Sequence, residues 1–112
     1  MSTLGDKHCR PCEGGIAPLT AAAAAQQLRQ LAEGWRLSED GRSLQREYRF
    51  VDFYRTMSFV NALAHIANIE DHHPDLEVGY NYLRVRYTTH AAGGLSENDF
   101  ICAAKIDTLA DK

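Results

Sequence analysis

The sequence predicts an α+β fold, with a four-stranded antiparallel sheet and three helices packed on one face of it. Two stretches alternate polar and apolar residues, and each belongs to a pair of short strands joined by a turn. Three other stretches repeat apolar residues at three- and four-residue steps, as amphipathic helices do. The elements follow one another as α-β-β-α-β-β-α. Helices stacked on one face of an antiparallel sheet are the economical packing for that order.

The first helix is followed directly by the first hairpin. Thr20 is the expected N-cap, and the helix is expected to run to about Glu33, where Gly34 ends it in the left-handed conformation. Residues 35–37 then form a short strand. An Asp-Gly turn leads from it into residues 44–50, whose side chains alternate as in a half-buried strand.

The second helix is longer and is expected to begin after Asp52 as its N-cap. One apolar stripe runs along it. Pro74 disfavours helical geometry at His73, so the helix should finish near Asp71 or His72.

The second hairpin is expected to consist of residues 76–80 and residues 82–89, with a turn near Asn81. Side-chain alternation divides its last strand into two faces. The face expected to point into the core carries Leu83, Val85 and Tyr87. The opposite face carries Arg84, Arg86 and Thr88, and the same parity assigns His90 to it.

The last helix begins at a capping box, in which Ser96 is the expected cap and Asp99 the reciprocal acid. Its apolar stripe consists of Phe100, Ala103, Ile106 and Leu109. We therefore expect a single domain over residues 19–112. Residues 1–18 are expected to form a flexible N-terminal arm, because they contain three glycines, two prolines and two cysteines.

Composition excludes several classes of function. The net charge of −3 argues against nucleic acid as the main partner, because phosphate binding needs a concentrated basic surface. No stretch approaches the roughly 18 apolar residues of a membrane span, and the N-terminus lacks the apolar core of a secretory signal. We therefore expect a cytoplasmic protein without a membrane partner. Three cysteines give no disulfide framework.

Three histidines stand out as candidates for chemistry. His72 and His73 precede Pro74 at the expected helix end, and His90 follows eighteen residues later. Imidazole titrates near neutral pH, so a cluster of histidines suits proton donation and removal. Alternatives remain open: a solvated helix C-terminus for the pair, an ordinary surface residue for His90, or a zinc site for all three. Adjacent histidines on an extended segment usually diverge, which disfavours the metal.

Residues 70–100, EDHHPDLEVGYNYLRVRYTTHAAGGLSENDF, resemble the signature region of the pterin-4a-carbinolamine dehydratase family. The shared features are the HHP motif, an aromatic hairpin turn containing Asn, a strand that ends in Thr-His, and Gly-Leu-Ser-Glu-x-Asp at the start of the last helix. The combination is specific, whereas HHP alone is weak. The similarity extends over roughly residues 20–109.

This resemblance implies that His72, His73 and His90 are the three active-site histidines, and that Asp99 lies in the site region. Many members carry an acid four positions before the first histidine, where this chain has Asn68. A nearby acid could replace it, with Glu70 as a supporting candidate beside Asp71 (residue 70, unlike 68, is not on the helix face of 72). We expect the three imidazoles to converge around a flat hollow beside the sheet.

The implied activity is dehydration of a 4a-hydroxytetrahydropterin to the quinonoid dihydropterin, in pterin recycling. The implied partner is this small-molecule substrate, with no cofactor and no metal, and relatives form homodimers or homotetramers. Alternatives are a weakly active pterin-binding protein or an interaction module. A zinc or redox module built on Cys9 and Cys12 is disfavoured, because a lone CxxC is half a zinc site. Cys102 is expected in the core.

Overall fold

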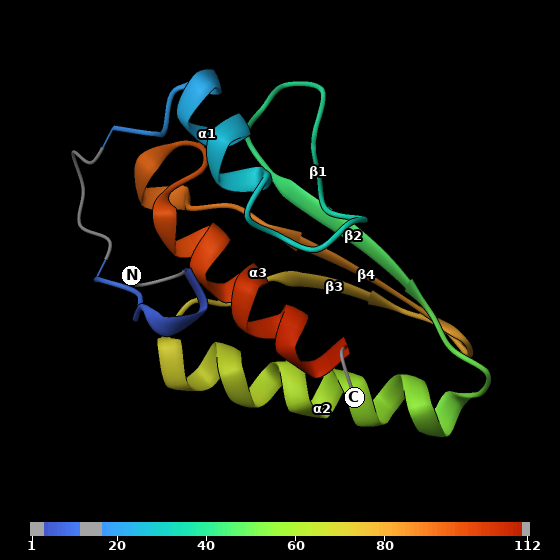
Figure 1. Cartoon of the computed structure of the whole chain (residues 1–112). Coiled ribbons are helices and arrows are strands. Elements are labelled where there is room, and N and C mark those ends of the chain that lie inside the picture. The colour runs from blue at the N-terminus through green and yellow to red at the C-terminus, as the bar shows by residue number, and fades with distance from the viewer. Residues whose placement is uncertain (1–3, 12–16, 111–112) are drawn as a thin grey trace.

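The computed structural model describes residues 4–11 and 17–110 and confirms the predicted α+β fold and element order. Figure 1 labels the elements. Within these ranges the helices are α1 (Ala21–Leu28), α2 (Phe53–Glu70) and α3 (Glu97–Ala110), and the strands are β1 (Arg36–Leu37), β2 (Leu44–Arg49), β3 (Asp75–Val78) and β4 (Tyr82–Tyr87). Two 3₁₀ turns, η1 (Leu4–Asp6) and η2 (His90–Ala92), complete the order.

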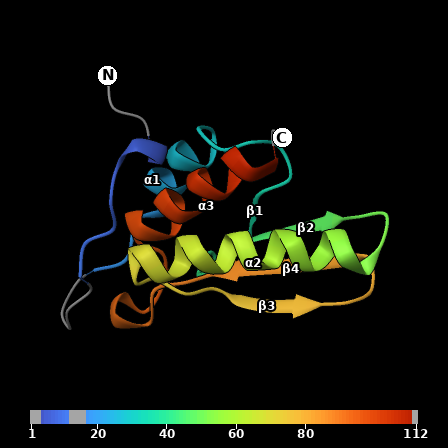
Figure 2. The ribbon, with the colours of Figure 1, turned by 90° about the horizontal axis from the view of Figure 1, so that it is seen from below.

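The strands form one antiparallel sheet in the order β1-β2-β4-β3. The two hairpins therefore meet through β2 and β4, where Tyr48 pairs with Leu83, and β3 is an edge strand. Figures 1 and 2 show the helices gathered on one side of the sheet. The other side is covered by no described element.

The core lies between the sheet and the helices. Leu83, Val85 and Tyr87 of β4 are buried, while Arg84 and Arg86 are exposed, as the alternation predicted. The most buried part of α3 is wider than the single predicted stripe, because every residue from 98 to 103 is buried. A helix buried all round needs cover on its outer side, and the segment before α1 provides that cover.

This N-terminal segment, residues 4–11, lies along α3 (Figure 2). Leu4 is 4% exposed and belongs to the main core. Lys105 donates from Nζ to the Gly5 carbonyl, and Lys7 pairs with Glu97 at the first turn of α3. These contacts bind part of the expected flexible arm to the domain. The division of the chain at residue 18 stays a prediction.

Helix α1 is shorter than predicted. It ends at Leu28 instead of about Glu33, although Thr20 caps it as expected, accepting from the Ala23 amide. The chain leaves the helical path because the Ala32 amide donates to a side chain of α3, Asp107 Oδ2, at 2.9 Å. Gly34 does adopt a positive φ of 107°, but six residues beyond the helix end.

Strand β4 ends at Tyr87, so the prediction that residues 82–89 are all strand, continuing toward His90, was wrong at its end. Thr88 donates from Oγ1 to the Arg42 carbonyl, and the Thr89 backbone pairs with Gly94 in an isolated bridge. The chain therefore turns, and His90 starts the 3₁₀ turn η2. The remaining boundaries of the strands agree with the prediction to within two residues.

Candidate active site

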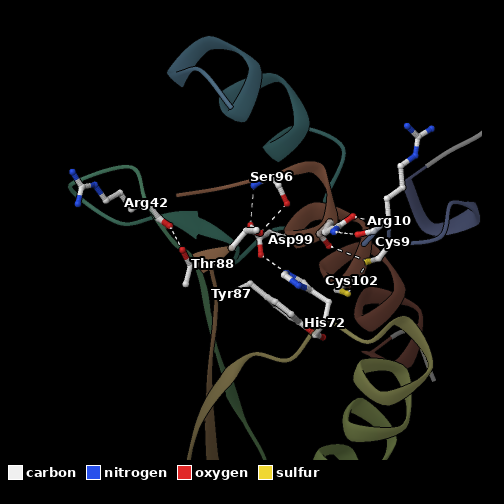
Figure 3. Close-up of polar contacts among 11 residues, drawn as sticks. Cys9, Arg10, Arg42, His72, Tyr87, Thr88, Ser96, Asp99 and Cys102 are labelled. Carbon is white, nitrogen blue, oxygen red and sulfur yellow. Dashed lines mark hydrogen bonds and ion pairs between the residues drawn. The ribbon is translucent and has the colours of Figure 1, made fainter. Parts of the chain in front are cut away.

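His72 and Asp99 form the central pair of the candidate site, at the junction of α2, α3 and β4. Helix α2 ends at Glu70, and Asp71 adopts the left-handed conformation (φ 51°, ψ 43°). This turn closes with the His72 amide donating to the Ala67 carbonyl and brings the His72 ring to α3. There Nε2 lies 2.6 Å from Asp99 Oδ1 (Figure 3). An ionised carboxylate only accepts hydrogen bonds, so Nε2 carries the proton.

The Asp99 carboxylate is fully buried and fully hydrogen-bonded. Its Oδ2 accepts from Thr89 Oγ1 and from the Ser96 amide, both at 2.9 Å. The second bond is the one that the capping box predicted. The Ser96 hydroxyl, however, pairs with Thr89 Oγ1 at 2.8 Å. Asp99 therefore caps α3 with one oxygen and holds His72 with the other.

The pKa of His72 lies above its ordinary value. Burial opposes this, since the side chain is only 12% exposed and burial lowers the pKa of an imidazole. The hydrogen bond to Asp99 and its negative charge outweigh burial, and Cys102 and Asp71 add smaller contributions. His72 is thus stabilised in its protonated form within a site that excludes most water.

Tyr87 fixes the plane of the His72 ring. The two rings stack with centroids 5.3 Å apart and planes 15° from parallel, and the Tyr87 hydroxyl donates to the His72 carbonyl at 3.4 Å. Burial raises the pKa of Tyr87, so the phenol stays protonated. Side-chain alternation predicted that Tyr87 lies in the core, but it did not predict this contact with His72. The pairing of β3 with β4 brings the segment after α2 next to β4, but the ring contact itself left no signal in the sequence.

His73 points away from this pair. It is exposed, and its Nε2 donates to Asn68 Oδ1 at 3.1 Å. Position 68 is predicted to share a helix face with residue 72, and its side chain accepts from His73. The residue that departs from the family pattern therefore still acts as an acceptor and orients one of the candidate histidines.

His90 is exposed on η2 and lines a hollow of about 300 Å³. Arg86 and Thr88, two of the three residues on the face to which strand parity assigned His90, also line this hollow, whereas Arg84 does not. No hydrogen bond, ion pair or ring contact of the described residues joins His90 to His72 or His73. The preceding residue, Thr89, is nevertheless bonded to Asp99, which places the His90 backbone next to the His72–Asp99 pair.

Glu70 lies on the other side of the α2 terminus. Its carboxylate is 4% exposed and accepts from the Cys9 amide at 2.7 Å and from His8 Nδ1 at 2.9 Å, with Lys105 at 4.0 Å. Burial raises the pKa of Glu70, but these donors outweigh burial and lower it. Glu70 therefore binds the N-terminal segment, and its supporting role in catalysis stays a prediction.

The described residues contain no group of three or more His, Cys, Asp or Glu side chains placed to hold a metal ion. Of the CxxC pair, Cys12 lies outside the described residues. Cys102 is buried on α3, as expected. No helix in the described part of the chain is both long enough and apolar enough to cross a membrane.

The fold and site define a class of small α+β domains in which a buried carboxylate at the start of one helix holds a histidine at the end of another. The chain belongs to the pterin 4 alpha carbinolamine dehydratase family, whose model matches residues 17–109.

Bacterial relatives with the provisional name pterin-4-alpha-carbinolamine dehydratase resemble nearly the whole chain. One from Nitrosomonas eutropha is 56% identical over 95% of this chain and 92% of its own length. One from Legionella pneumophila (strain Corby) is 57% identical over 96% of each chain.

Two solved structures share the fold. The transcriptional coactivator/pterin dehydratase from Brucella melitensis superposes with a TM-score of 0.77 at 33% identity, over 83% of this chain and 98% of that one. A pterin dehydratase-like RuBisCO assembly factor of the α-carboxysome gives a TM-score of 0.61 at 24% identity, over 70% of this chain and 90% of its own. The second likeness concerns the fold alone.

Proposed function

We propose that this protein dehydrates 4a-hydroxytetrahydropterin to the quinonoid dihydropterin and water by histidine acid–base catalysis. The observation that carries the proposal is the buried His72–Asp99 pair, with Nε2 and Oδ1 2.6 Å apart, in a chain of the dehydratase family.

The reaction needs one proton delivered to the departing 4a-hydroxyl and one removed from a ring nitrogen. The substrate thereby loses water without oxidation or reduction. Positioned imidazoles that titrate near neutral pH can perform both transfers. The substrate returns one proton for each that it takes, so the enzyme gains and loses none overall, and proton exchange with solvent restores the starting charge states of the donor and the acceptor.

His72 is suited to protonate the leaving hydroxyl. Its raised pKa favours the protonated form of the ring, which is the form that can donate. Asp99 holds the Nε2 proton in either charge state, so the proton that is exchanged is the one on Nδ1. We assign proton removal to His90, and orientation of the pterin to His73 and Asn68. For this to operate, a bound pterin has to span from the His72 ring to the hollow beside His90.

Dehydratase assays with synthetic carbinolamine test these roles. Replacement of His72 or His90 by Ala is expected to lower kcat by about 10²–10⁴-fold, the usual contribution of a general acid or base. The uncatalysed rate is subtracted before the comparison. His73→Ala is expected to raise KM more than it lowers kcat. His65→Ala is the matched control, because His65 is an exposed histidine of α2 outside the site. Rates like the wild type in both His72→Ala and His90→Ala would contradict the proposal.

We further propose a cytoplasmic location, a role in pterin recycling, and a homodimer or homotetramer. Self-association is favoured by the edge strand β3, whose Leu76 and Val78 are 37% and 40% exposed. Size-exclusion chromatography with light scattering measures the assembly directly. If the assays show weak turnover although pterin binding is intact, Asn68→Glu is the first substitution to make, because it restores the acid that many family members carry at this position.

A further inference from the structure

Cys9 and Cys102 lie side by side although 93 positions separate them. Their Sγ atoms are 3.5 Å apart, and both thiols are free. Figure 3 shows Cys9 reaching α3 from the N-terminal segment, with its sulfur next to that of Cys102. Neither thiol has a part in the proposed dehydration.

The backbone around Cys9 is held on both sides of the thiol. The Cys9 amide donates to Glu70 Oε1 at 2.7 Å. The next residue, Arg10, forms a reciprocal pair with Asn98: its amide donates to Oδ1 at 3.0 Å, and Asn98 Nδ2 donates to its carbonyl at 2.7 Å. Asn98 lies one helical turn before Cys102. The two thiols are thus preorganised, which gives a reaction between them a high effective concentration.

The pair combines access with reactivity. Cys9 is half-buried, so a small oxidant reaches it, whereas Cys102 is fully buried behind it. The hydrogen bond between the two thiols lowers the pKa of Cys102, and the charge of His72 adds to this, while burial opposes it. The same hydrogen bond raises the pKa of Cys9. Once either sulfur is oxidised, the other lies 3.5 Å away and is placed to attack it as a thiolate and close the disulfide.

We propose that Cys9 and Cys102 form a reversible disulfide when the protein meets hydrogen peroxide, and that this bond fastens the N-terminal segment to the helix that carries Asp99. The two thiols are oxidised and the peroxide is reduced. Two S–H bonds and the O–O bond break, one S–S bond forms, and the hydrogens leave in two water molecules.

Closure demands little movement. The sulfur atoms have to approach from 3.5 Å to about 2.0 Å, the length of a disulfide bond. Cys9 lies outside helices and strands, so rotation of its side chain and a small shift of its backbone supply the difference. In a reducing compartment such a bond is transient, which is the usual behaviour of cytosolic disulfides that respond to oxidants.

The competing partner is Cys12. It follows Cys9 at the spacing of a CxxC motif, and Pro11 protects the Arg10–Pro11 bond from trypsin, so both cysteines fall in one tryptic peptide. The experiment therefore has to distinguish a bond of Cys102 with Cys9 from one with Cys12, and both from a Cys9–Cys12 bond.

The test treats the reduced full-length protein with equimolar hydrogen peroxide and analyses it by non-reducing mass spectrometry. We expect the intact mass to fall by two hydrogen atoms and the peptides containing Cys9 and Cys102 to be linked. Dithiothreitol should restore the original mass. The oxidised protein should melt about 10 °C higher than the reduced protein, because the bond closes a loop of nearly the whole chain.

Matched variants decide the assignment. Cys12→Ser is expected to retain the linked peptides and the shift in melting temperature. Cys9→Ser and Cys102→Ala are each expected to lose both. Circular dichroism of reduced Cys9→Ser checks its fold, since its thiol is partly exposed. A linked peptide that survives Cys9→Ser, a Cys9–Cys12 bond, or oxidation of the two thiols to separate oxyacids would overturn the proposal.

Discussion

The two oxygens of Asp99 serve different parts of the molecule. Oδ2 accepts from the Ser96 amide, which has no partner within helix α3, and Oδ1 accepts from His72, 27 positions earlier in the chain. A carboxylate that is 0% exposed and bonded at both oxygens is a costly group to disturb, because any donor left without it stays buried and unsatisfied.

Asp99→Asn is expected to lower the pKa of His72. The substitution removes the negative charge that opposes the effect of burial, and an amide oxygen is a weaker acceptor. NMR titration of the imidazole signals measures this pKa. Glu97→Gln is the control, because it removes the same charge from the same turn of α3 at a side chain that is 41% exposed. An unchanged His72 titration in Asp99→Asn would contradict the assigned contact.

At this scale the sequence contained part of the site. The spacing of Ser96 and Asp99 identified the capping acid, and the HHP motif identified His72. The sequence could not predict which donors form hydrogen bonds with Asp99, namely His72 and Thr89. Those bonds depend on how α2 and β4 end, and helix and strand ends are set by tertiary contacts more than by local pattern.

At the scale of the elements, Asp107 joins two segments to α3 through three hydrogen bonds. Its carboxylate accepts from Trp35 Nε1 at 2.7 Å, from the Ala32 amide at 2.9 Å and from Arg46 Nη1 at 3.1 Å. Arg46 also lies over the Tyr48 ring, 4.4 Å from its centroid. This group ties the loop after α1 and strand β2 to the last helix.

Asp107→Ala is expected to destabilise the fold by about 2–3 kcal/mol. The change leaves a partly buried arginine and an indole N–H without their acceptor, and the better helix propensity of Ala offsets only a small part of that loss. Chemical denaturation measures the free energy of unfolding. Glu39→Ala, at an exposed acid in the first hairpin turn, is expected to change it by less than about 0.5 kcal/mol.

The same acid explains why α1 was predicted too long. Residues 29–33 have ordinary helix-forming side chains, and the donation from the Ala32 amide to a side chain 75 positions away leaves no signal in the local sequence. His90 is the parallel case, because alternation continues through Thr89 while the isolated bridge to Gly94 ends the strand. Element types were readable from periodicity, and ends that depend on distant partners were not.

For the whole molecule, the shifted pKa values of Glu70 and His72, at the end of α2, predict a pH range of maximal stability. The lowered pKa of Glu70 means that its contribution is present above the ordinary value of 4.5 and is lost as the pH falls through the folded value. The raised pKa of His72 means that its contribution is present below the ordinary value of 6.5 and is lost as the pH rises through the folded value.

The melting temperature is therefore expected to be highest between pH 4.5 and pH 6.5. Differential scanning calorimetry at a series of pH values measures it. Glu70→Gln should flatten the acid side of the curve, and Asp99→Asn the side above pH 6.5. A maximum that stays well above pH 7 in the wild type would contradict the linkage assigned to His72.

The binding of the N-terminal segment to α3 also constrains how the chain folds during synthesis. Residues 4–11 leave the ribosome well before Asn98, Cys102 and Lys105, which follow their partners by 88, 93 and 100 positions. During synthesis domains generally fold as units, so the parts of one domain wait for each other. Within this domain, residues 4–11 have to wait, with Leu4 uncovered, until α3 has been released. A nascent chain stalled before α3 should therefore be open to proteases at its beginning, and completion of the last helix should close that site.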